Sequence, residues 1–391
     1  MVYRARHEAL CDDLPPAFLG HRHISDIRIA EGLHQSVVST LGVPGGIAGR
    51  VYQGIRGVTR LLGKCMLAKL QPLQLPATPL RDAVLAALNG AIGDRLVASN
   101  SPLAIPMTLR WRGEALSWQS PPAGFPATGK VLLLVHGLCM NDRHWHARHQ
   151  GQVVDHGAAL ALSLGYTPVY LRYNSGLHTS QNGRELSALL EQLVKHWPTP
   201  IRELTVMSHS MGGLVTRSAV HYAKRGALGW PAHLRNLVFL GTPHHGSPLE
   251  RAGNWVDTVL RSTPFLAPLS RLGQVRSAGI TDLRYGYVVD EDWLGHDRFC
   301  RKPDNREVVP LPEGVACYTV AATMARHRSA LSNRLIGDGF VPLHSALGQH
   351  DDARRTLVSA DASQWIAYGM SHHQLLSSPE VTLQLERWLG R

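Results

Sequence analysis

The sequence predicts an α/β fold in which helices flank a mostly parallel sheet. From about residue 129 onward, short apolar runs of strand length alternate with longer segments in which apolar residues recur every three or four positions. Such alternation is typical of strand–helix–strand units, which build parallel sheets. Prolines and glycines gather in the stretch 120–130, which indicates a linker or loop. We therefore expect a basic, partly helical N-terminal extension over 1–120 and one large domain over 125–391.

The elements expected in the large domain follow one another in a regular order. Strands are expected at 130–137, 167–174, 204–208, 234–243 and 315–323, and helices at 155–165, 182–197, 211–226 and 377–390. Their ends carry the usual signals: Gly165 follows one helix, Pro198 closes another, and Ser378 or Ser377 is placed to cap the last. The alternation lapses over about 247–313, which predicts an inserted cap above the carboxyl edge of the sheet.

The composition is that of a globular protein, with 44% apolar and 18% charged residues. The formal charge is +11 and the pI about 9.7, but the positive charge is mostly scattered arginine. Because there is no zinc finger and no basic run with interleaved aromatic residues, nucleic acid is not an expected partner. The charge is compatible with an anionic membrane, although a basic soluble surface is the simpler interpretation.

The cysteines predict reduced thiols rather than a disulfide framework. They are odd in number, far apart and free of Cys-x-x-Cys spacing: Cys11, Cys65, Cys139, Cys300 and Cys317. The N-terminus lacks an apolar core of signal-peptide length, and no run of about 18 apolar residues predicts a transmembrane helix. We therefore expect a cytoplasmic protein, at most peripheral to a membrane.

A segment of the N-terminal extension, 45–70, has the pattern of an amphipathic helix. Its apolar positions share one face and three basic residues share another: Ile47, Val51, Ile55, Val58, Leu62 and Met66 against Arg56, Arg60 and Lys64. One interpretation is an interfacial helix on anionic lipid. The other, which we favour, is a helix that packs its apolar stripe on the large domain.

The stretch LTVMSHSMGGLV, residues 204–215, places Ser210 between an expected strand and an expected helix. A sharp turn at this point would present the Ser210 hydroxyl at the end of the sheet, with the helix N-terminus directed at developing negative charge. The pattern is close to Gly-x-Ser-x-Gly, with Gly212 in place and Ser208 instead of the first glycine. Serine is small enough for such a turn, so Ser210 is our candidate nucleophile.

Two further turns are expected at the same edge of the sheet. His136 and Gly137 follow a buried strand, so the N–H of Leu138 is positioned to join that of Met211 as an oxyanion hole. The sequence GTPHHGSP follows another strand. We expect the neighbouring side chains to shape the pocket: His136, Gly137, His209, Thr242, His244 and His245.

The motifs HGL, SHSMGG and GTPHHGSP, in this order and spacing, resemble those of the α/β-hydrolases, in particular the lipase and esterase branch. GTPHHG is also similar to a motif of the bacterial relatives of GPI inositol-deacylase and of secreted triacylglycerol lipases. The resemblance covers about residues 129–389. It implies a catalytic triad in the chain order Ser, then Asp or Glu, then His, so the acid and the base lie downstream of Ser210.

The resemblance also indicates the other two triad residues. In LIGDGFVPLHSA, Asp338 resembles the triad acid of an Asp-Gly-x-Val-Pro turn; the alternatives are carboxylates of the predicted cap, Asp282, Asp290 and Asp304. In YGMSHHQLLSSPEV, His372 lies at the family's position before Leu375 and Leu376. His373 remains the alternative base, one residue away in register.

Other histidines receive a structural interpretation. His144, His146, His149 and His156 crowd one region, but they lack the i, i+4 pair plus carboxylate of a zinc hydrolase. A reactive thiol is conceivable at Cys139, although a small packing residue is the favoured interpretation. We expect neither a metal nor a cofactor.

The function expected from these residues is hydrolysis of a carboxylic ester, with an acyl or lipid-like substrate implied by the resemblance. An acyltransferase that uses another alcohol in place of water is the near alternative. A non-catalytic scaffold or membrane-recruitment protein, acting through residues 1–120, is the alternative from another class. The oligomeric state is left open.

Overall fold

The computed structural model describes residues 78–118, 121–247, 276–300, 303–325, 337–358 and 361–390. The predicted amphipathic helix within 45–70 and residues 248–275 of the predicted cap lie outside these ranges. The large compact unit comprises residues 77–94 and 105–391, and the following description concerns its described part.

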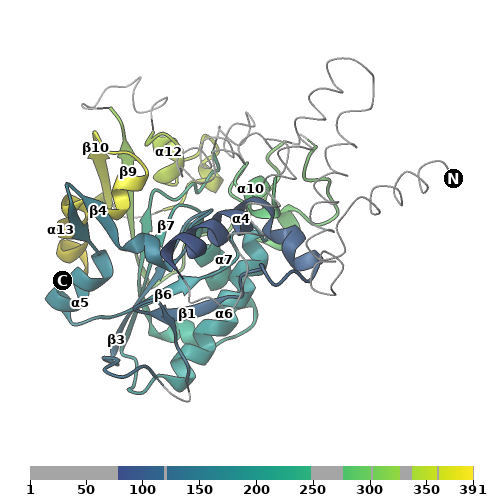
Figure 1. Cartoon of the computed structure of the whole chain (residues 1–391). Coiled ribbons are helices and arrows are strands. Elements are labelled where there is room, and N and C mark those ends of the chain that lie inside the picture. Colours follow the sequence, from purple (N-terminus) through teal and green to yellow (C-terminus); the bar gives the residue numbers. More distant parts are fainter. Residues whose placement is uncertain are drawn as a thin grey trace. The chain divides into compact units, whose positions relative to one another are not determined.

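An eight-stranded sheet forms the centre of this unit (Figure 1). Its order is β10-β9-β8-β7-β3-β6-β1-β2, and every pair from β10 to β6 is parallel. The strands are β1 (Thr108–Trp111), β2 (Glu114–Ala115), β3 (Lys130–Val135), β6 (Thr167–Arg172), β7 (Glu203–His209), β8 (Leu234–Leu240), β9 (Ala316–Thr323) and β10 (Gln364–Tyr368). The predicted mostly parallel sheet is confirmed.

One edge of the sheet is antiparallel and is formed by residues 108–115. These residues precede residue 120, where the N-terminal extension was expected to end, and they belong to the sheet. Strand β1 pairs antiparallel with β6, and β2 pairs antiparallel with β1. The pair Trp111 and Glu114 encloses a two-residue turn, in which Arg112 has φ 49° and Gly113 has φ 82°. Two central residues with positive φ make the tight hairpin turn that suits the twist of paired strands.

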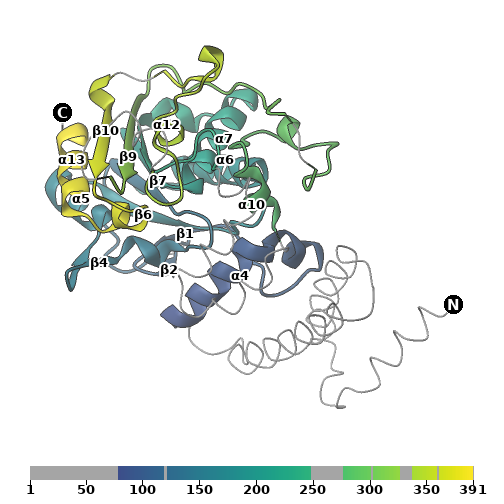
Figure 2. The ribbon, with the colours of Figure 1, turned by 90° about the horizontal axis from the view of Figure 1, so that it is seen from above.

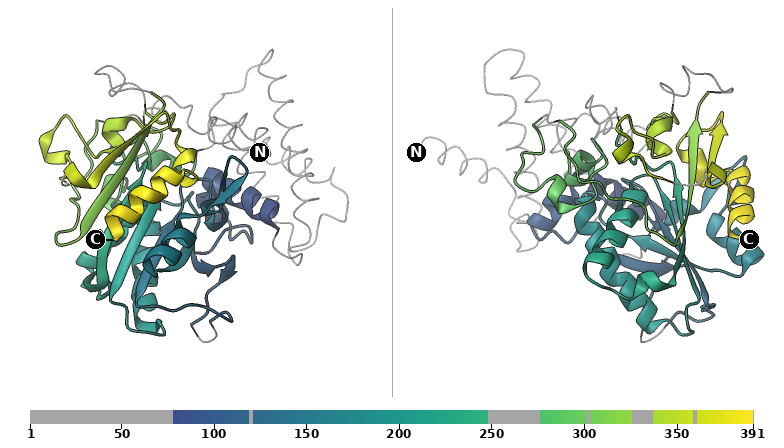
Figure 3. Two further views of the ribbon diagram at one scale, coloured as in Figure 1. Left: turned by 90° about the vertical axis from the view of Figure 1, so that its left-hand side faces the viewer. Right: turned by 180° about the vertical axis from the view of Figure 1, so that it is seen from behind.

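Helices cover both faces of the sheet. On one face α6 (Thr179–His196) packs against α7 (Met211–Arg225), and on the other α5 (His156–Leu164) packs against α13 (Pro379–Leu389) (Figures 2 and 3). The side chains of β3 alternate between two cores, as a period of two requires. Leu133 belongs to the core that contains Leu186 of α6, and Leu134 to the core that contains Leu385 of α13.

The predicted helix ends are confirmed where the structure shows their caps. Gly165 follows α5 with φ 72°, the left-handed conformation that glycine adopts at low cost. Ser378 precedes α13, and its hydroxyl accepts a hydrogen bond from the N–H of Glu380 at 3.2 Å. Local sequence therefore sets where these two helices stop and start.

The other described helices are α4 (Pro79–Ala98), α10 (Ala278–Asp282) and α12 (Leu343–Ala346), and a small antiparallel ribbon joins β4 (Ala147–His149) to β5 (Gln152–Val154). Helix α4 is kinked at Ile92, whose φ of −139° is not helical. Within the described ranges, none of the helices combines the length and apolarity that a membrane crossing requires.

Candidate active site

Ser210 lies at a sharp turn between β7 and α7. Its φ of 55° and ψ of −126° are rare for a residue with a side chain. The backbone N–H of Ser210 donates to Leu240 O of the neighbouring strand β8 at 2.9 Å, which fixes the turn against the sheet. Such backbone strain is typical of a nucleophile presented at the edge of an α/β sheet.

The two glycines after Met211 allow this turn to lie close to the neighbouring strand ends. A Cβ on Gly212 would be 2.6 Å from the carbonyl oxygen of His136, and a Cβ on Gly213 would be 2.0 Å from Oγ1 of Thr242. Neither position has room for a side chain. The sequence pattern Met-Gly-Gly therefore reflects a close approach of α7 to the loops after β3 and β8.

Ser208, which stands where the motif has glycine, is fully buried. Its hydroxyl lies 2.7 Å from the hydroxyl of Thr216, which in turn donates to Gly212 O at 2.9 Å. Since the Thr216 proton is used in that bond, Ser208 is the donor of the pair. The serine thus has a partner for its hydroxyl and ties β7 to the first turns of α7.

Asp338 and His372 are joined by two hydrogen bonds. The Asp338 carboxylate accepts from Nδ1 of His372 at 2.6 Å, and the His372 backbone N–H donates to Asp338 O at 3.0 Å. The second carboxylate oxygen of Asp338 accepts from the N–H groups of Phe340 and Val341. This carboxylate is therefore held in place from both sides, and it orients the imidazole of His372.

His372 and Ser210 belong to loops at the same edge of the sheet. The strands β7, β8, β9 and β10 are parallel, so their carboxyl ends meet there. A Cβ on Gly241, which follows β8, would be 3.1 Å from two ring atoms of His372. Only a glycine lets the imidazole lie so close to the strand end next to the serine turn.

His209 and His373 differ in what they contact. The His209 ring nitrogen Nε2 lies 3.1 Å from His372 O, and the two rings are 4.6 Å apart between centroids. The ring of His373 lies against Phe340, and the residue is exposed, whereas His372 is buried. The structure therefore pairs Asp338 with His372, while His209 supports the backbone of His372.

The predicted oxyanion loop passes next to Ser210. A Cβ on Gly137 would be 3.0 Å from Cβ of Ser210, so Leu138 follows immediately beside the serine. Met211 is the first residue of α7, and its N–H therefore has no acceptor within the helix. His136 is buried, its ring stacks on Tyr173 at 4.3 Å, and burial lowers its pKa to about 3. His136 is thus a neutral support of this loop.

Helix α4 packs against the predicted oxyanion loop, a contact that sequence reasoning missed. A Cβ on Gly90 would be 2.3 Å from Sγ of Cys139 and 2.8 Å from its Cα. Cys139 has φ 60°, and its N–H donates to the hydroxyl of Ser175 at 3.0 Å. Burial raises the pKa of the Cys139 thiol to about 12, so it is a packing group and not a nucleophile.

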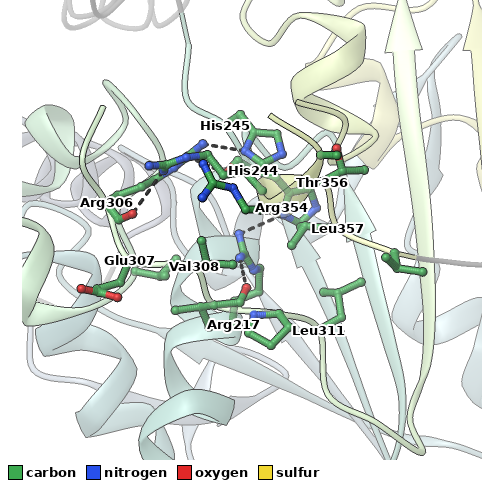
Figure 4. A pocket seen from close by; sticks show the side chains of 17 residues that line it. Arg217, His244, His245, Arg306, Glu307, Val308, Leu311, Arg354, Thr356 and Leu357 are labelled. Carbon is green, nitrogen blue, oxygen red and sulfur yellow. Dashed lines mark hydrogen bonds between the residues drawn. The ribbon is translucent and has the colours of Figure 1, made fainter. Parts of the chain in front are cut away.

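The remaining predicted pocket residues follow β8. Thr242 is buried beneath Gly213. His244 and His245 line a hollow whose lining does not include Ser210 (Figure 4), and their expected role in the pocket of the serine stays a prediction. The turn after β8 directs these two residues toward Arg217 of α7 and Arg306, with which they share the hollow.

The four histidines considered as metal ligands have other surroundings. His144 contacts Asn141, His146 contacts Asp155 at 2.6 Å, and the two nitrogens of His156 contact Thr382 and Leu375 O. His149 lies in β4 opposite Gln152 of β5. Among the residues that the structure describes, no group of three or more His, Cys, Asp or Glu side chains is placed to hold a metal ion.

The class of fold follows from three features. They are the order of the strands, the strained turn after β7 and the Asp–His pair beyond β9 and β10. A mostly parallel sheet with helices on both faces, and with these residues in the order Ser, Asp, His, is the α/β-hydrolase fold. The chemistry that this arrangement permits is nucleophilic attack by Ser210, with an oriented imidazole as proton acceptor.

Comparisons with known proteins give the following matches. A family model described as a domain of unknown function (DUF7379) matches residues 103–283. The mature form of a Bacillus licheniformis lipase is 16% identical, with a TM-score of 0.44 and coverage of 73% of this chain and 98% of that one. A Staphylococcus hyicus lipase is 12% identical, with a TM-score of 0.40 and coverage of 69% and 97%. Aspergillus fumigatus lipase B is 13% identical, with a TM-score of 0.41 and coverage of 69% and 55%.

Proposed function

We propose that this protein is a serine hydrolase that cleaves carboxylic esters. The observation that carries the proposal is the strained turn that presents Ser210, at φ 55°, on the sheet edge where Asp338 holds Nδ1 of His372 at 2.6 Å. Serine becomes a nucleophile when a base removes its proton and the oxyanion is stabilised. The fold alone does not define a reaction, so the proposal depends on this local geometry.

The proposed reaction assigns one role to each residue. Oγ of Ser210 attacks the ester carbonyl carbon while Nε2 of His372 takes the serine proton. The N–H groups of Leu138 and Met211 donate to the developing oxyanion. His372 then gives its proton to the leaving alcohol, which leaves an acyl-serine. Water, deprotonated by His372, releases the carboxylic acid and restores Ser210. Asp338 keeps the imidazole in the tautomer with Nδ1 protonated and stabilises its positive charge.

The substrate proposed is an ester with an acyl chain, in keeping with the lipase-like motifs around Ser210 and Asp338. Contact with an anionic membrane, through the basic N-terminal 120 residues, would bring such a substrate to the enzyme, and this part of the proposal is separate from the chemistry. If another alcohol replaced water in the second step, the same residues would catalyse acyl transfer.

A fluorophosphonate probe and a series of p-nitrophenyl esters test the proposal. We expect the full-length wild type to be labelled and to cleave at least one ester, and Ser210→Ala to lose labelling and about 10³-fold or more of the activity. The control is Ser163→Ala, which removes an exposed serine from α5 and should leave both unchanged. A folded wild type that neither reacts with the probe nor cleaves any ester, from short to long chains, would refute the proposal. Ester products formed on adding an alcohol would indicate acyl transfer.

A further inference from the structure

The hollow lined by His244 and His245 has a volume of about 280 Å³ and lies beside α7 and the turn after β8 (Figure 4). It is walled by Arg217, His244 and His245 together with parts of the segments 286–311 and 353–358. A single water needs only about 10–15 Å³ of such space. The hollow is therefore large enough for a small organic molecule.

One side of the hollow carries two buried guanidinium groups. Arg217 is 6% exposed and Arg306 is 7% exposed. Arg217 donates to Val309 O at 2.6 Å and approaches Nδ1 of His244 at 3.5 Å, while its Nε is buried without a partner. Since an arginine has five N–H donors, Arg217 retains donors for another acceptor.

The two histidines of the hollow are neutral and do not add charge. Arg306 can only donate, so Nδ1 of His245, at 2.7 Å, is the acceptor, and Nε2 of His245 carries the proton that goes to Gly348 O. Burial, followed by the charge of Arg306, lowers the pKa of His245 to about 3. Burial, followed by the charge of Arg217, also lowers the pKa of His244 far below its ordinary value.

Arg217 makes no salt bridge with a carboxylate in the described part of the chain. Asp292 acts on it electrostatically, but the Asp292 oxygens already accept the N–H groups of Val288, Val289 and Glu307. Glu307 is exposed, and its carboxylate points away from the two arginines in Figure 4. Burying a cation without a counter-ion costs free energy. Burial, followed by repulsion from Arg306, accordingly lowers the pKa of Arg217 to about 9.

Much of the remaining wall of the hollow is apolar, although Arg354, Arg355 and Thr356 also line it. Val288, Val309 and Leu357 are buried there, and Leu311 and Val358 complete the wall. A binding site of this kind, with a few convergent polar groups in an apolar lining, is typical of small-molecule sites. Its occupant needs a negative group for Arg217 and a hydrocarbon part for the valines and leucines.

We propose that this hollow is a binding site for a small organic anion, whose carboxylate or phosphate contacts Arg217 and whose aliphatic part lies on Val288, Val309 and Leu357. A carboxylate or phosphate accepts parallel hydrogen bonds from a guanidinium fork, and either one would neutralise Arg217. Arg306 already has a counter-ion, because its guanidinium lies 3.3 Å from the carboxylate of Asp304. The site is separate from Ser210 and does not depend on ester hydrolysis.

Calorimetric titration of the full-length protein tests the site. The probes are hexanoate, hexyl phosphate, inorganic phosphate, and hexylamine as the cation with the same hydrocarbon part. We expect saturable binding of hexanoate or hexyl phosphate, and the tighter of the two identifies the headgroup. Inorganic phosphate should bind more weakly because it has no apolar part, and hexylamine should not bind. Equal binding of hexylamine, or no saturable binding of either hexyl anion, would overturn the proposal.

Substitutions in α7 test whether the anion binds in this hollow. Arg217→Met should weaken hexyl-anion binding by roughly 10- to 100-fold, since hydrogen bonds to charged groups are the strong ones. The matched control is Arg225→Met, which removes an exposed arginine from the same helix and should bind like the wild type. If Arg217→Met does not fold, Arg217→Lys keeps the charge but loses the fork, and should still weaken binding. Unchanged affinity of the folded variant for the hexyl anions would refute the site. Loss of binding after Ser210 has been phosphonylated would also refute it, because the anion would then bind at the serine.

Discussion

At the scale of single residues, His209 connects the turn of Ser210 to the loop of His372. It directly precedes the serine in sequence, and its ring contacts the backbone oxygen of His372. Burial lowers the pKa of His209 well below its ordinary value, with a further contribution from the charge of His372. A neutral His209 that donates from Nε2 therefore positions the proposed base without adding a second charge beside it.

The first prediction concerns this hydrogen bond. His209→Leu removes the donor but keeps an apolar side chain, so we expect kcat to fall by about 2- to 10-fold, the usual worth of one neutral hydrogen bond, with KM nearly unchanged. His209→Gln places an amide donor near the same position and should restore most of kcat. Steady-state kinetics on a p-nitrophenyl ester measure both, and an equal loss of kcat in the two variants would contradict a positioning role.

At the scale of elements, the region around Ser210 was predictable because its determinants are local. A strand of apolar residues, a small residue on each side of the turn and two glycines at the start of a helix specify the turn within about ten positions. The strands β3, β6, β7, β8 and β9 and the helices α5, α6, α7 and α13 followed from periodicity in the same way, whereas β4, β5, β10, α10 and α12 were not predicted. The role of Ser208 could be recognised only in the structure, because its partner Thr216 lies eight residues further along the chain, in α7.

The contacts that sequence reasoning missed join elements distant in the chain. Gly90 and Cys139 touch across 49 positions, and nothing in either local pattern indicates the other. The hairpin of β1 and β2 is too short for a clear period of two. Arg217 was unremarkable in sequence, because an arginine on a helix is usually exposed. It is buried here because the segments 303–311 and 353–358 cover it.

The contact between α4 and the oxyanion loop supports a prediction at this scale. Alanine usually stabilises a helix by about 0.5–1 kcal/mol relative to glycine. In Gly90→Ala, however, the new Cβ would lie 2.8 Å from the backbone of Cys139, so the loop carrying Leu138 must shift. We expect about a tenfold or greater loss of kcat/KM, because a displaced oxyanion donor costs this much.

The matched control is Gly226→Ala at the end of α7. Gly226 has φ −89°, which alanine adopts, and its nearest contact would be 3.2 Å. This variant should retain wild-type activity when both proteins are compared on the same ester. If Gly90→Ala is as active as Gly226→Ala, helix α4 does not position the oxyanion loop.

At the scale of the whole molecule, buried neutral histidines link stability to pH. Burial lowers the pKa of each member of a set that lies in or next to the sheet: His136, His156, His209, His244 and His245. Below about pH 6.5 the unfolded chain binds protons at these imidazoles, while the folded protein does not. The free energy of unfolding therefore falls as the pH falls. The raised pKa of His146 beside Asp155 acts in the opposite direction, but it is one group against this set.

We accordingly expect the urea midpoint to fall steadily from pH 7.5 to 5, before the carboxylates are protonated. The lowered pKa values of Asp82 and Asp155 preserve their contribution down to about pH 4, so the loss above that pH belongs to the imidazoles. Each histidine contributes a slope of at most about 1.4 kcal/mol per pH unit. His156→Gln keeps a donor for Leu375 O but removes one titrating group, and it should flatten the slope between pH 6.5 and 5. As a control, His196→Gln changes an exposed histidine and should retain the wild-type slope. A free energy of unfolding that does not change with pH over this range would show that the buried histidines do not make stability depend on pH.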